Sequence, residues 1–444
     1  MALTWAQVSD MAKLEYLPVM IDHITLEDFA MKYIRKMKKV ENVNYEFVKS
    51  FRTSFSEGTK MMRDVTEPLA QPGQRSYKKF VGTTKWRNGV IKIYEPIAQL
   101  MKKDEKAFID ELSQEISGIA DAMKAEQERM AYGDGGITPL AKCAATATTS
   151  DDSPLLISCT STKLLRPGMF IDFLNDTGDS NNHSPITNGT GLEIEDIVDD
   201  THFTVRVKVT GDVLDDLKTD LNNALIYHQG GYKNETYGFM SLFGSTDNTI
   251  FGINRSHTSG AWFRPQVKRI GNSSNSGSSG SSGNTTNSML VNGPATGTPK
   301  HWELKDLDQA LKILTIQKKA NKNELKIFTT PGIESYAIGL CQQAGEVMMA
   351  PRKSIDLWPY EVIEFNGVPM LVGNLVPDNT MFIPDMSGFV LFEAMKLQFS
   401  DMDGNMWKWD NGYAAYVAFL LEAYELGHYT PWKCMTIFDM AQSY

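Results

Sequence analysis

The sequence predicts an α+β protein, and three observations lead to this fold class. One long amphipathic helical pattern covers residues 104–136, short strand patterns follow in residues 142–235, and helices alternate with strands from Trp302 onward. At 444 residues, of which 42% are hydrophobic, the chain is long enough for two or three globular domains. We therefore expect a large buried core.

The helical pattern of residues 104–136 is narrow and long. Between its charged and amide residues, apolar residues recur at helical spacing: Phe108, Leu112, Ile116, Ile119, Met123 and Met130. At ~1.5 Å per residue, some 28 residues reach about 40 Å, which is longer than a helix needs to cross a small domain. Gly133, Gly135 and Gly136 favour an abrupt C-terminal cap. We expect this helix to pack against a sheet through Leu112, Ile116, Ile119 and Met123.

Residues 75–96 mix strand-forming residues with lysine and arginine. Tyr77 and Phe80 mark one strand, Val90 and its neighbours mark a second, and Arg87-Asn88-Gly89 predicts a turn between them. The segment therefore predicts a charged hairpin that lies away from the core of its own subunit. Its cations are candidates for contact with an adjacent chain: Lys78, Lys79, Lys85, Arg87 and Lys92.

The charge of the chain is distributed unevenly. Residues 1–103 contain 18 Lys/Arg and 11 Asp/Glu, whereas the other residues contain 26 and 43, and the total net charge is −10. A basic N-terminal part on an acidic body suits head-to-tail contact between copies of the chain. Nucleic-acid binding by the basic part is the alternative. It has little support, because no nucleic-acid module is recognisable and an acidic body repels phosphate.

Residues 142–235 contain five or six short strand patterns separated by Gly, Asn, Asp or Pro. Residues 201–209 alternate apolar with polar side chains, which predicts one buried face. The block therefore predicts a small barrel or curled sandwich. Its surface is expected to be acidic, because residues 140–235 hold 15 acidic and 7 basic side chains. Carbohydrate binding or hydrolysis by this block is an alternative function, although aromatic residues are sparse in it.

The rest of the chain predicts a loop and a mixed α/β layer. Residues 271–288 contain only Gly, Ser, Asn and Thr, which predicts a mobile loop, and they lack the Gly-Lys-Ser/Thr of a phosphate-binding loop. Residues 304–320 predict an amphipathic helix, and Asn366-Gly367 predicts the turn of a hairpin. Residues 412–440 predict long strands.

The sequence shows no recognisable catalytic or metal-binding motif. The seven His residues show no metal-ligand spacing. We expect Asp401 and Asp403 to form a turn rather than a glycosidase carboxylate pair or a calcium loop. We expect Glu422 to be a paired or rim carboxylate rather than a general acid. No signal peptide or membrane span is present. The cysteines are scattered and predict reduced thiols: Cys143, Cys159, Cys341 and Cys434. We expect no enzyme activity, no cofactor and no bound metal.

Four motifs follow one another along the chain: Tyr132-Gly133-Asp134-Gly135, Tyr237-Gly238-Phe239 followed by Arg255 and Trp262, Phe365-Asn366-Gly367-Val368-Pro369, and Asp401-Met402-Asp403-Gly404. This order resembles that in the major capsid proteins of tailed bacteriophages. Those proteins have the Hong Kong 97-like fold, which encapsulins share. The resemblance spans nearly the whole chain. It implies an N-terminal arm (1–50), an E-loop hairpin (51–99), a spine helix with the start of a peripheral domain (100–141), an inserted all-β domain (142–235), a peripheral–axial connection with the loop 271–288 (236–302), an axial domain (303–391) and a C-terminal return through the peripheral domain (392–444).

The resemblance implies a structural protein of the virion. Hexamers and pentamers of the chain would assemble in the host cytoplasm into an icosahedral or prolate shell, which encloses double-stranded DNA without recognising it. A scaffolding protein, a portal and a decoration protein are further candidate partners. Residues 1–50 are too short for a cleavable scaffold plus an arm, so we expect assembly without proteolysis of this chain. An encapsulin-type nanocompartment is the alternative, although the inserted β-block and the residues 271–288 favour a phage.

Overall fold

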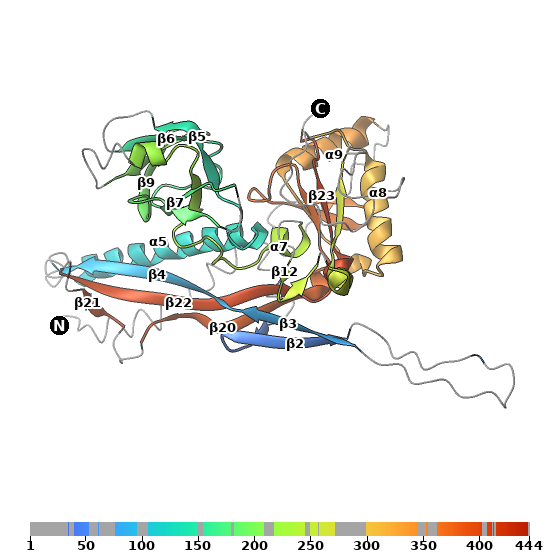
Figure 1. Cartoon of the computed structure of the whole chain (residues 1–444), viewed down its shortest axis with the longest axis horizontal. Coiled ribbons are helices and arrows are strands. Elements are labelled where there is room, and N and C mark those ends of the chain that lie inside the picture. Colours follow the sequence, from blue (N-terminus) through green and yellow to red (C-terminus); the bar gives the residue numbers. More distant parts are fainter. Residues whose placement is uncertain are drawn as a thin grey trace.

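The long helix α5 (Glu105–Tyr132) lies along an extended sheet, and a barrel and a mixed α/β sheet stand on the same side of that sheet (Figure 1). The α+β prediction is confirmed. The predicted loop 271–288, most of the predicted arm and all but Asp401 of the predicted turn at residues 401–404 lie outside the described residues. The computed structural model describes residues 34, 40–52, 61, 76–95, 105–148, 154–178, 182–207, 217–244, 249–255, 257–270, 299–343, 352–353, 362–401, 406–410, 412 and 414–442.

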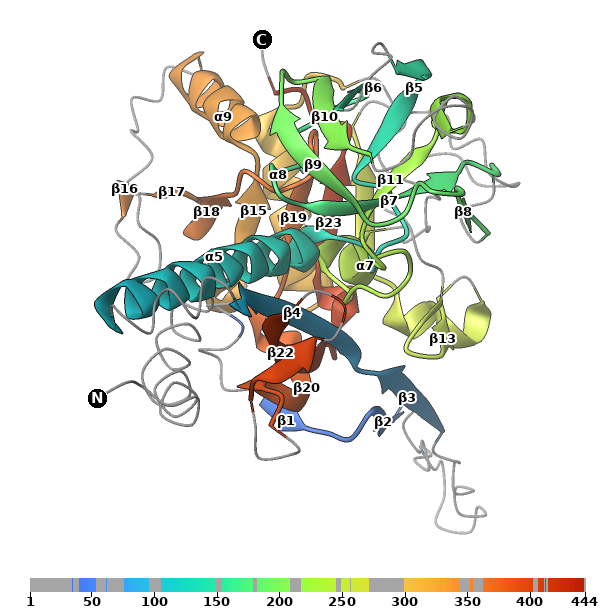
Figure 2. The same cartoon turned by 90° about the vertical axis from the view of Figure 1, so that its left-hand side faces the viewer.

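The extended sheet is built on the long strand β22 (Ala415–His428), which runs antiparallel to β20 (Phe389–Phe399) on one side. Along its other side lies β4 (Lys85–Tyr94). The short β21 (Lys408–Asp410) pairs with the start of β22 on the same side as β20, and β1 (Val40–Asn42) pairs with β20 in parallel. Helix α5 crosses one face of this sheet (Figure 2). The shared core contains Ile91, Ile93, Ile116, Met123 and Leu420.

The barrel contains the residues that were predicted to form a small barrel or sandwich. Its antiparallel order is β11-β5-β6-β10-β9-β7, and a further pairing between β11 and β7 closes the ring. Apolar side chains fill the interior, as expected of a barrel this small. The strands are β5 (Ala141–Thr148), β6 (Leu155–Cys159), β7 (Phe170–Asn175), β9 (Leu192–Ile197), β10 (His202–Arg206) and β11 (Leu225–His228), with β8 (Ser184–Pro185) added beside β7.

The mixed α/β sheet has the order β14-β23-β19-β15-β18-β17-β16. Its strands are β14 (Gln266–Arg269), β15 (Ile327–Thr329), β16 (Arg352–Lys353), β17 (Val362–Phe365), β18 (Val368–Val372), β19 (Met381–Ile383) and β23 (Met435–Phe438). Helices α8 (Leu304–Lys312) and α9 (Pro331–Gln343) contribute Leu307, Leu311 and Ile333 to its core. The predicted hairpin turn is confirmed, since Asn366 and Gly367 have φ angles of 53° and 72°.

A central aromatic core joins these layers. It is organised around α7 (Phe239–Phe243), whose C-terminal carbonyls at Ser241 and Leu242 accept hydrogen bonds of 2.9 Å from the buried guanidinium of Arg255. Gly238 is required at the start of α7, because a Cβ there would lie 2.2 Å from the Met130 carbonyl oxygen. The remaining short elements are β12 (Thr249–Ile250), β13 (Ile253–Asn254), a π-helical turn at Ile313–Gln317, and 3₁₀ turns at Thr258–Phe263, Lys322–Glu324, Met386–Gly388 and Pro431–Lys433.

Candidate assembly surface and its anchorage

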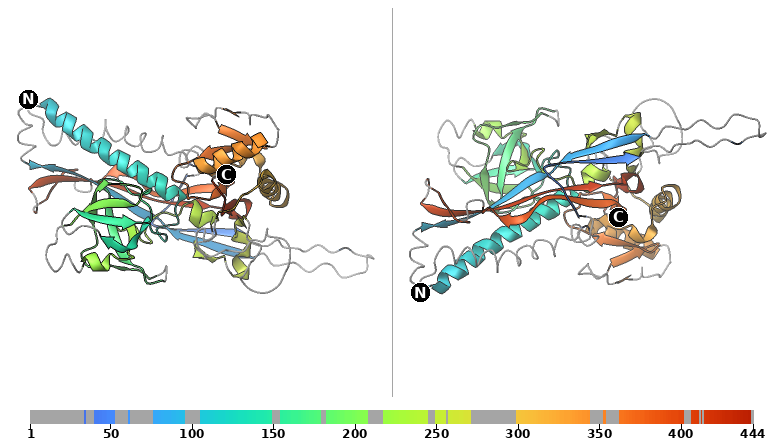
Figure 3. Two further views of the ribbon diagram at one scale, coloured as in Figure 1. Left: turned by 90° about the horizontal axis from the view of Figure 1, so that it is seen from above. Right: turned by 90° about the horizontal axis from the view of Figure 1, so that it is seen from below.

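Strands β2 (Glu46–Arg52) and β3 (Tyr77–Thr83) form a two-stranded ribbon that projects from one end of the extended sheet (Figure 3). Its first strand begins inside residues 1–50, which we had assigned to the arm. One face of the ribbon packs on its own subunit. There Phe47 stacks on Phe392 with ring centroids 3.9 Å apart, and Phe80 stacks on Phe251 at 4.1 Å. Phe47 and Phe51, four residues apart on β2, are the sequence signal for this packed face.

The opposite face of this ribbon exposes three large apolar side chains among polar ones. Val48 and Val81 are directly opposite each other and are 60% and 39% exposed, and Tyr77 is 58% exposed. These side chains alternate with the Phe residues of the inner face, so they share the outer face with Lys79. An isolated two-stranded ribbon is only marginally stable, and an exposed apolar patch marks an interaction site. We define Val48, Tyr77, Lys79 and Val81 as the ribbon face.

The predicted turn at Arg87-Asn88-Gly89 is wrong. These residues lie within β4 and pair with Glu422, Leu421 and Leu420 of β22. The prediction that residues 75–96 lie away from their own core is also wrong, because Phe80, Ile91 and Ile93 are buried. The hairpin partner of β3 is β2, and the partner of β4 is β22.

The structure divides the five candidate cations into two groups. Lys78 and Lys79 are exposed on β3, and their contact with an adjacent chain stays a prediction. The three on β4 contact their own chain. Lys85 donates to the Lys233 carbonyl oxygen at 3.0 Å, and Lys92 pairs with Asp410 at 3.2 Å.

The third of these, Arg87, anchors β4 to both α5 and β22. Its guanidinium donates to the Met123 carbonyl oxygen at 2.9 Å and to the Gln127 side-chain oxygen at 3.3 Å. It also forms a buried ion pair with Glu422. The prediction that Glu422 is a paired carboxylate is confirmed. Removing one partner of such a pair leaves the other charge buried and uncompensated.

The predicted spine core packs as expected where its side chains are described. Ile116 and Met123 are buried, and Ile119 is half-buried against the same cluster. The side chain of Leu112 lies outside the described residues. A Cβ at Gly89 would lie 3.1 Å from the Ile119 Cγ2 and 3.3 Å from the Met123 Sδ. Gly89 thus permits the close approach of helix and strand.

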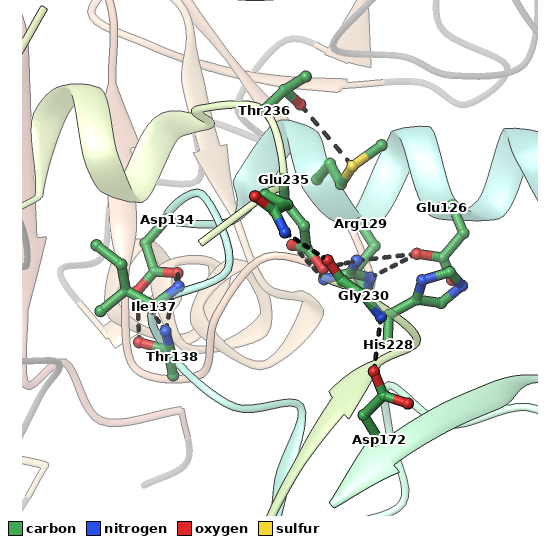
Figure 4. A network of polar contacts seen from close by, with 12 residues as sticks. Glu126, Arg129, Asp134, Ile137, Thr138, Asp172, His228, Gly230, Glu235 and Thr236 are labelled. Carbon is green, nitrogen blue, oxygen red and sulfur yellow. Dashed lines mark hydrogen bonds and ion pairs between the residues drawn. The ribbon is translucent and has the colours of Figure 1, made fainter. Parts of the chain in front are cut away.

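A network of buried charges connects α5 to the barrel (Figure 4). Arg129 on α5 binds Glu235 through two hydrogen bonds, of 3.0 and 2.5 Å, and donates to Glu126 at 3.0 Å. The other oxygen of Glu126 accepts from Arg166, which lies between β6 and β7 of the barrel, and is 4.0 Å from His228. Burial opposes ionisation of Glu126, but electrostatic interactions with Arg129, His228 and Arg166 outweigh this effect and lower the pKa of Glu126 to about 2.

These charges line a cleft between α5, β4 and the barrel with a volume of about 880 Å³. Glu126, Arg129 and Glu235 on its wall hold one another in ion pairs. Together with Arg166, these ion pairs connect α5 to the barrel at the wall of the cleft.

Glu425 is a second buried carboxyl, on the strand β22. One oxygen accepts from the Tyr237 and Leu426 amides at 2.7 and 3.0 Å, and the other has no hydrogen-bond partner among the described residues. Burial raises the pKa of Glu425 to about 8, against the opposing effect of the Tyr237 amide. This carboxyl joins β22 to Tyr237, which in turn bridges Asp134 just after α5.

The described residues contain neither a candidate metal site nor a helix that could span a membrane. Among the described residues, no three His, Cys, Asp or Glu side chains lie close enough together to hold a metal ion. No helix within the described ranges is long and apolar enough to cross a bilayer.

Comparison with known proteins gives no family model and no curated relative that matches the chain. Solved structures do match along most of their length. The capsid asymmetric unit of cyanophage A-1(L) has 12% identity and a TM-score of 0.49, with 90% of each chain covered. The holo-SrpI encapsulin complex from Synechococcus elongatus PCC 7942 has 9% identity and a TM-score of 0.42, with 93% of this chain and 89% of that chain covered. The satellite phage P4 procapsid including size determination (Sid) protein has 8% identity and a TM-score of 0.38, with 93% and 90% covered.

Proposed function

We propose that this chain is a shell-forming structural protein, the major capsid protein of a tailed bacteriophage. The observation that carries the proposal is the ribbon face, an apolar surface on a projecting two-stranded ribbon. Two further points support it. The motif order resembles that family along nearly the whole chain, and the ribbon strands β2 and β3 precede the long helix, as the E-loop precedes the spine helix in that resemblance.

The ribbon is built to transmit force between subunits. Strand β3 continues into β4 through the buried Thr84, whose amide donates to the Tyr45 carbonyl oxygen at 2.9 Å. The strand β4 is in turn fixed to β22 along its whole length and to α5 through Arg87. A load applied at the ribbon face would therefore reach the extended sheet rather than bend a flexible arm.

The energy available at one ribbon face is modest. Covering three half-exposed apolar side chains contributes on the order of 1 kcal/mol each. Such a contact between copies is heterologous, so it repeats around a closed ring, and the total grows with each subunit added. We propose that hexamers and pentamers form in this way in the host cytoplasm and enclose DNA in the virion without specific contacts. A scaffolding protein, portal and decoration protein remain candidate partners.

Two alternatives remain. An encapsulin-type shell has the same proposed fold but a protein cargo, and the contents of purified particles distinguish it from a phage capsid. A carbohydrate-binding or hydrolytic protein would place its site on the barrel. The interior of that barrel is filled by buried side chains such as Phe173, Ile194 and Phe203, which leaves only its outside for a ligand.

The test replaces both valines of the ribbon face in one variant, Val48→Asp with Val81→Asp. We expect an unassembled, folded subunit, because both side chains point away from their own core. The matched control is Val198→Asp, since Val198 is 57% exposed on the barrel. Size exclusion and negative-stain microscopy measure assembly, and circular dichroism measures folding. Normal shells from the double variant would refute the proposal.

A second variant tests the exposed cations separately. Lys78→Glu with Lys79→Glu should weaken assembly, and added salt should weaken parental assembly through the same charges. Lys85 is excluded from this variant because it binds its own chain. Assembly that is unaffected by both the charge reversal and salt would show that the ribbon acts through its apolar residues alone.

The contents of the particles separate the phage capsid from the encapsulin. Nuclease-protected DNA inside them indicates a phage capsid, and a protein cargo indicates an encapsulin.

A further inference from the structure

The barrel brings together two cysteines that are far apart in sequence. Cys143 on β5 and Cys159 on β6 are directly opposite each other in an antiparallel pair. Both side chains are buried in the barrel interior as free thiols. The sequence predicted scattered, independent thiols, because the spacing between these two gives no recognisable motif. Their proximity comes from strand pairing alone.

The hydrogen bonds show which kind of cross-strand site this is. The Cys143 amide donates to the Ala224 carbonyl oxygen and the Cys159 amide to the Thr201 carbonyl oxygen, each at 2.8 Å. Neither amide therefore binds the opposite cysteine. The bond between the strands instead runs beside the pair, from the Thr160 amide to the Lys142 carbonyl oxygen. This is the non-hydrogen-bonded site of an antiparallel ladder.

Such a site has the geometry that a disulfide requires. Residues opposite each other in a non-hydrogen-bonded pair have Cα atoms about 4.5 Å apart, and their side chains leave the sheet on the same face. Disulfides span Cα separations of about 4.4–6.8 Å. The backbone of the barrel therefore has no need to move far for the two sulfur atoms to bond.

We propose that Cys143 and Cys159 form a redox modification site, a cross-strand disulfide that ties β5 to β6. The oxidant is a low-molecular-weight disulfide such as oxidised glutathione. One thiol loses its proton and its sulfur attacks the oxidant, which gives a mixed disulfide and releases one reduced thiol. The second cysteine sulfur then displaces the remaining glutathione as a second reduced thiol. Two protein thiols are oxidised and one external disulfide is reduced.

Burial controls when this reaction occurs. Burial, with a smaller effect from the neighbouring Cys159, raises the pKa of Cys143 to about 12, so little reactive thiolate exists at neutral pH in the folded barrel. The disulfide should therefore form rapidly while the barrel folds in an oxidising medium and slowly once it has folded. In a reducing cytosol the thiols stay reduced, and in an oxidising exterior the slow reaction proceeds.

The other two cysteines supply an internal control. Cys434 lies in the central core, where its Sγ accepts from the Asp385 amide at 3.3 Å, and Cys341 lies on α9. Neither is opposite another cysteine in the pairings of the described strands. A variant with Cys341→Ser and Cys434→Ala retains only the barrel pair, and a variant with Cys143→Ser and Cys159→Ser retains only the other two.

The experiment refolds each variant of the full chain with a mixture of reduced and oxidised glutathione, then alkylates it for peptide mass mapping. We expect the first variant to lose both reactive thiols and to give a linked peptide containing Cys143 and Cys159. The second variant should keep both thiols. Exposed to the same mixture after folding, the first variant should oxidise much more slowly.

The physical consequence is measured on the same samples. The oxidised barrel should melt at a higher temperature than the reduced barrel, because the disulfide closes a loop of about 15 residues in the unfolded chain. Reduction should restore the lower midpoint. Glutathione adducts or links between chains in place of the Cys143–Cys159 link would overturn the proposal, as would a lower midpoint after oxidation.

Discussion

Glu425 gives the sharpest test of how the spine helix is joined to the extended sheet. Its pKa of about 8 lies above the ordinary value of 4.5, so the folded state keeps this proton at a pH where the unfolded chain has lost it. The stability that the neutral carboxyl contributes is therefore fully present below about pH 4.5. It is lost as the pH rises toward 8 and stays lost above that pH.

The substitution Glu425→Gln keeps a neutral side chain at every pH. The gap between 4.5 and about 8, at about 1.4 kcal/mol per pH unit, corresponds to about 5 kcal/mol. We expect the variant to match the parent near pH 4.5 and to exceed its free energy of unfolding by up to about this amount at pH 9. Glutamine retains an oxygen to accept from the Tyr237 and Leu426 amides.

The assay is denaturant unfolding of the unassembled subunit between pH 4.5 and 9, with the variant compared to the parent at each pH. The control is Glu115→Gln, because Glu115 is exposed on α5 and its neutralisation should have little effect. A difference between Glu425→Gln and the parent that stays constant over this range would refute the reasoning. It would mean that the carboxyl is ionised in the folded state at neutral pH.

Two further predictions concern α5. Ile116→Ala should lower the free energy of unfolding by about 2–5 kcal/mol, because it leaves a cavity against β4. The control Gln114→Ala, on the exposed side of α5, should change this free energy little. Equal effects of the two variants in an unfolding titration would exclude the packing described. Glu126→Gln should lower the free energy of unfolding by about 3 kcal/mol at neutral pH. The reason is that the pKa of Glu126 is about 2 in the folded state, below its ordinary value of 4.5, so its carboxylate contributes stability above pH 4.5. That contribution is lost as the pH falls toward 2, so unfolding measured near pH 2 should no longer distinguish variant from parent.

The sequence predicted most securely those elements whose pattern is local. The stripe that contains Ile116 and Met123 predicted one face of α5, and alternation predicted the buried Phe203 and Val205 of the barrel. In these elements the residues that define the pattern are also the residues that pack. The core side of a helix or strand can then be read without knowing its partner.

A comparison of two Asn-Gly sequences in the chain shows where such reasoning fails. Asn366-Gly367 forms the tight turn that its sequence predicts, with positive φ at both residues. Asn88-Gly89 has the same local preference but lies in the middle of β4. There β22 offers a partner along ten paired positions, and α5 approaches so closely that a Cβ at Gly89 would crowd the side chains of Ile119 and Met123. Contacts from residues distant in sequence overcame the turn preference.

The cations of β4 were misassigned for the same reason. A charged segment whose partners are unknown resembles a solvated arm, and the partners of Arg87 and Lys92 come more than 300 residues later, at Glu422 and Asp410. Once these pairs are known, the basic charge of β4 belongs to the folding of the subunit. The surface left for a neighbour is then the outer face of β2 and β3, where Val48 and Val81 are 60% and 39% exposed.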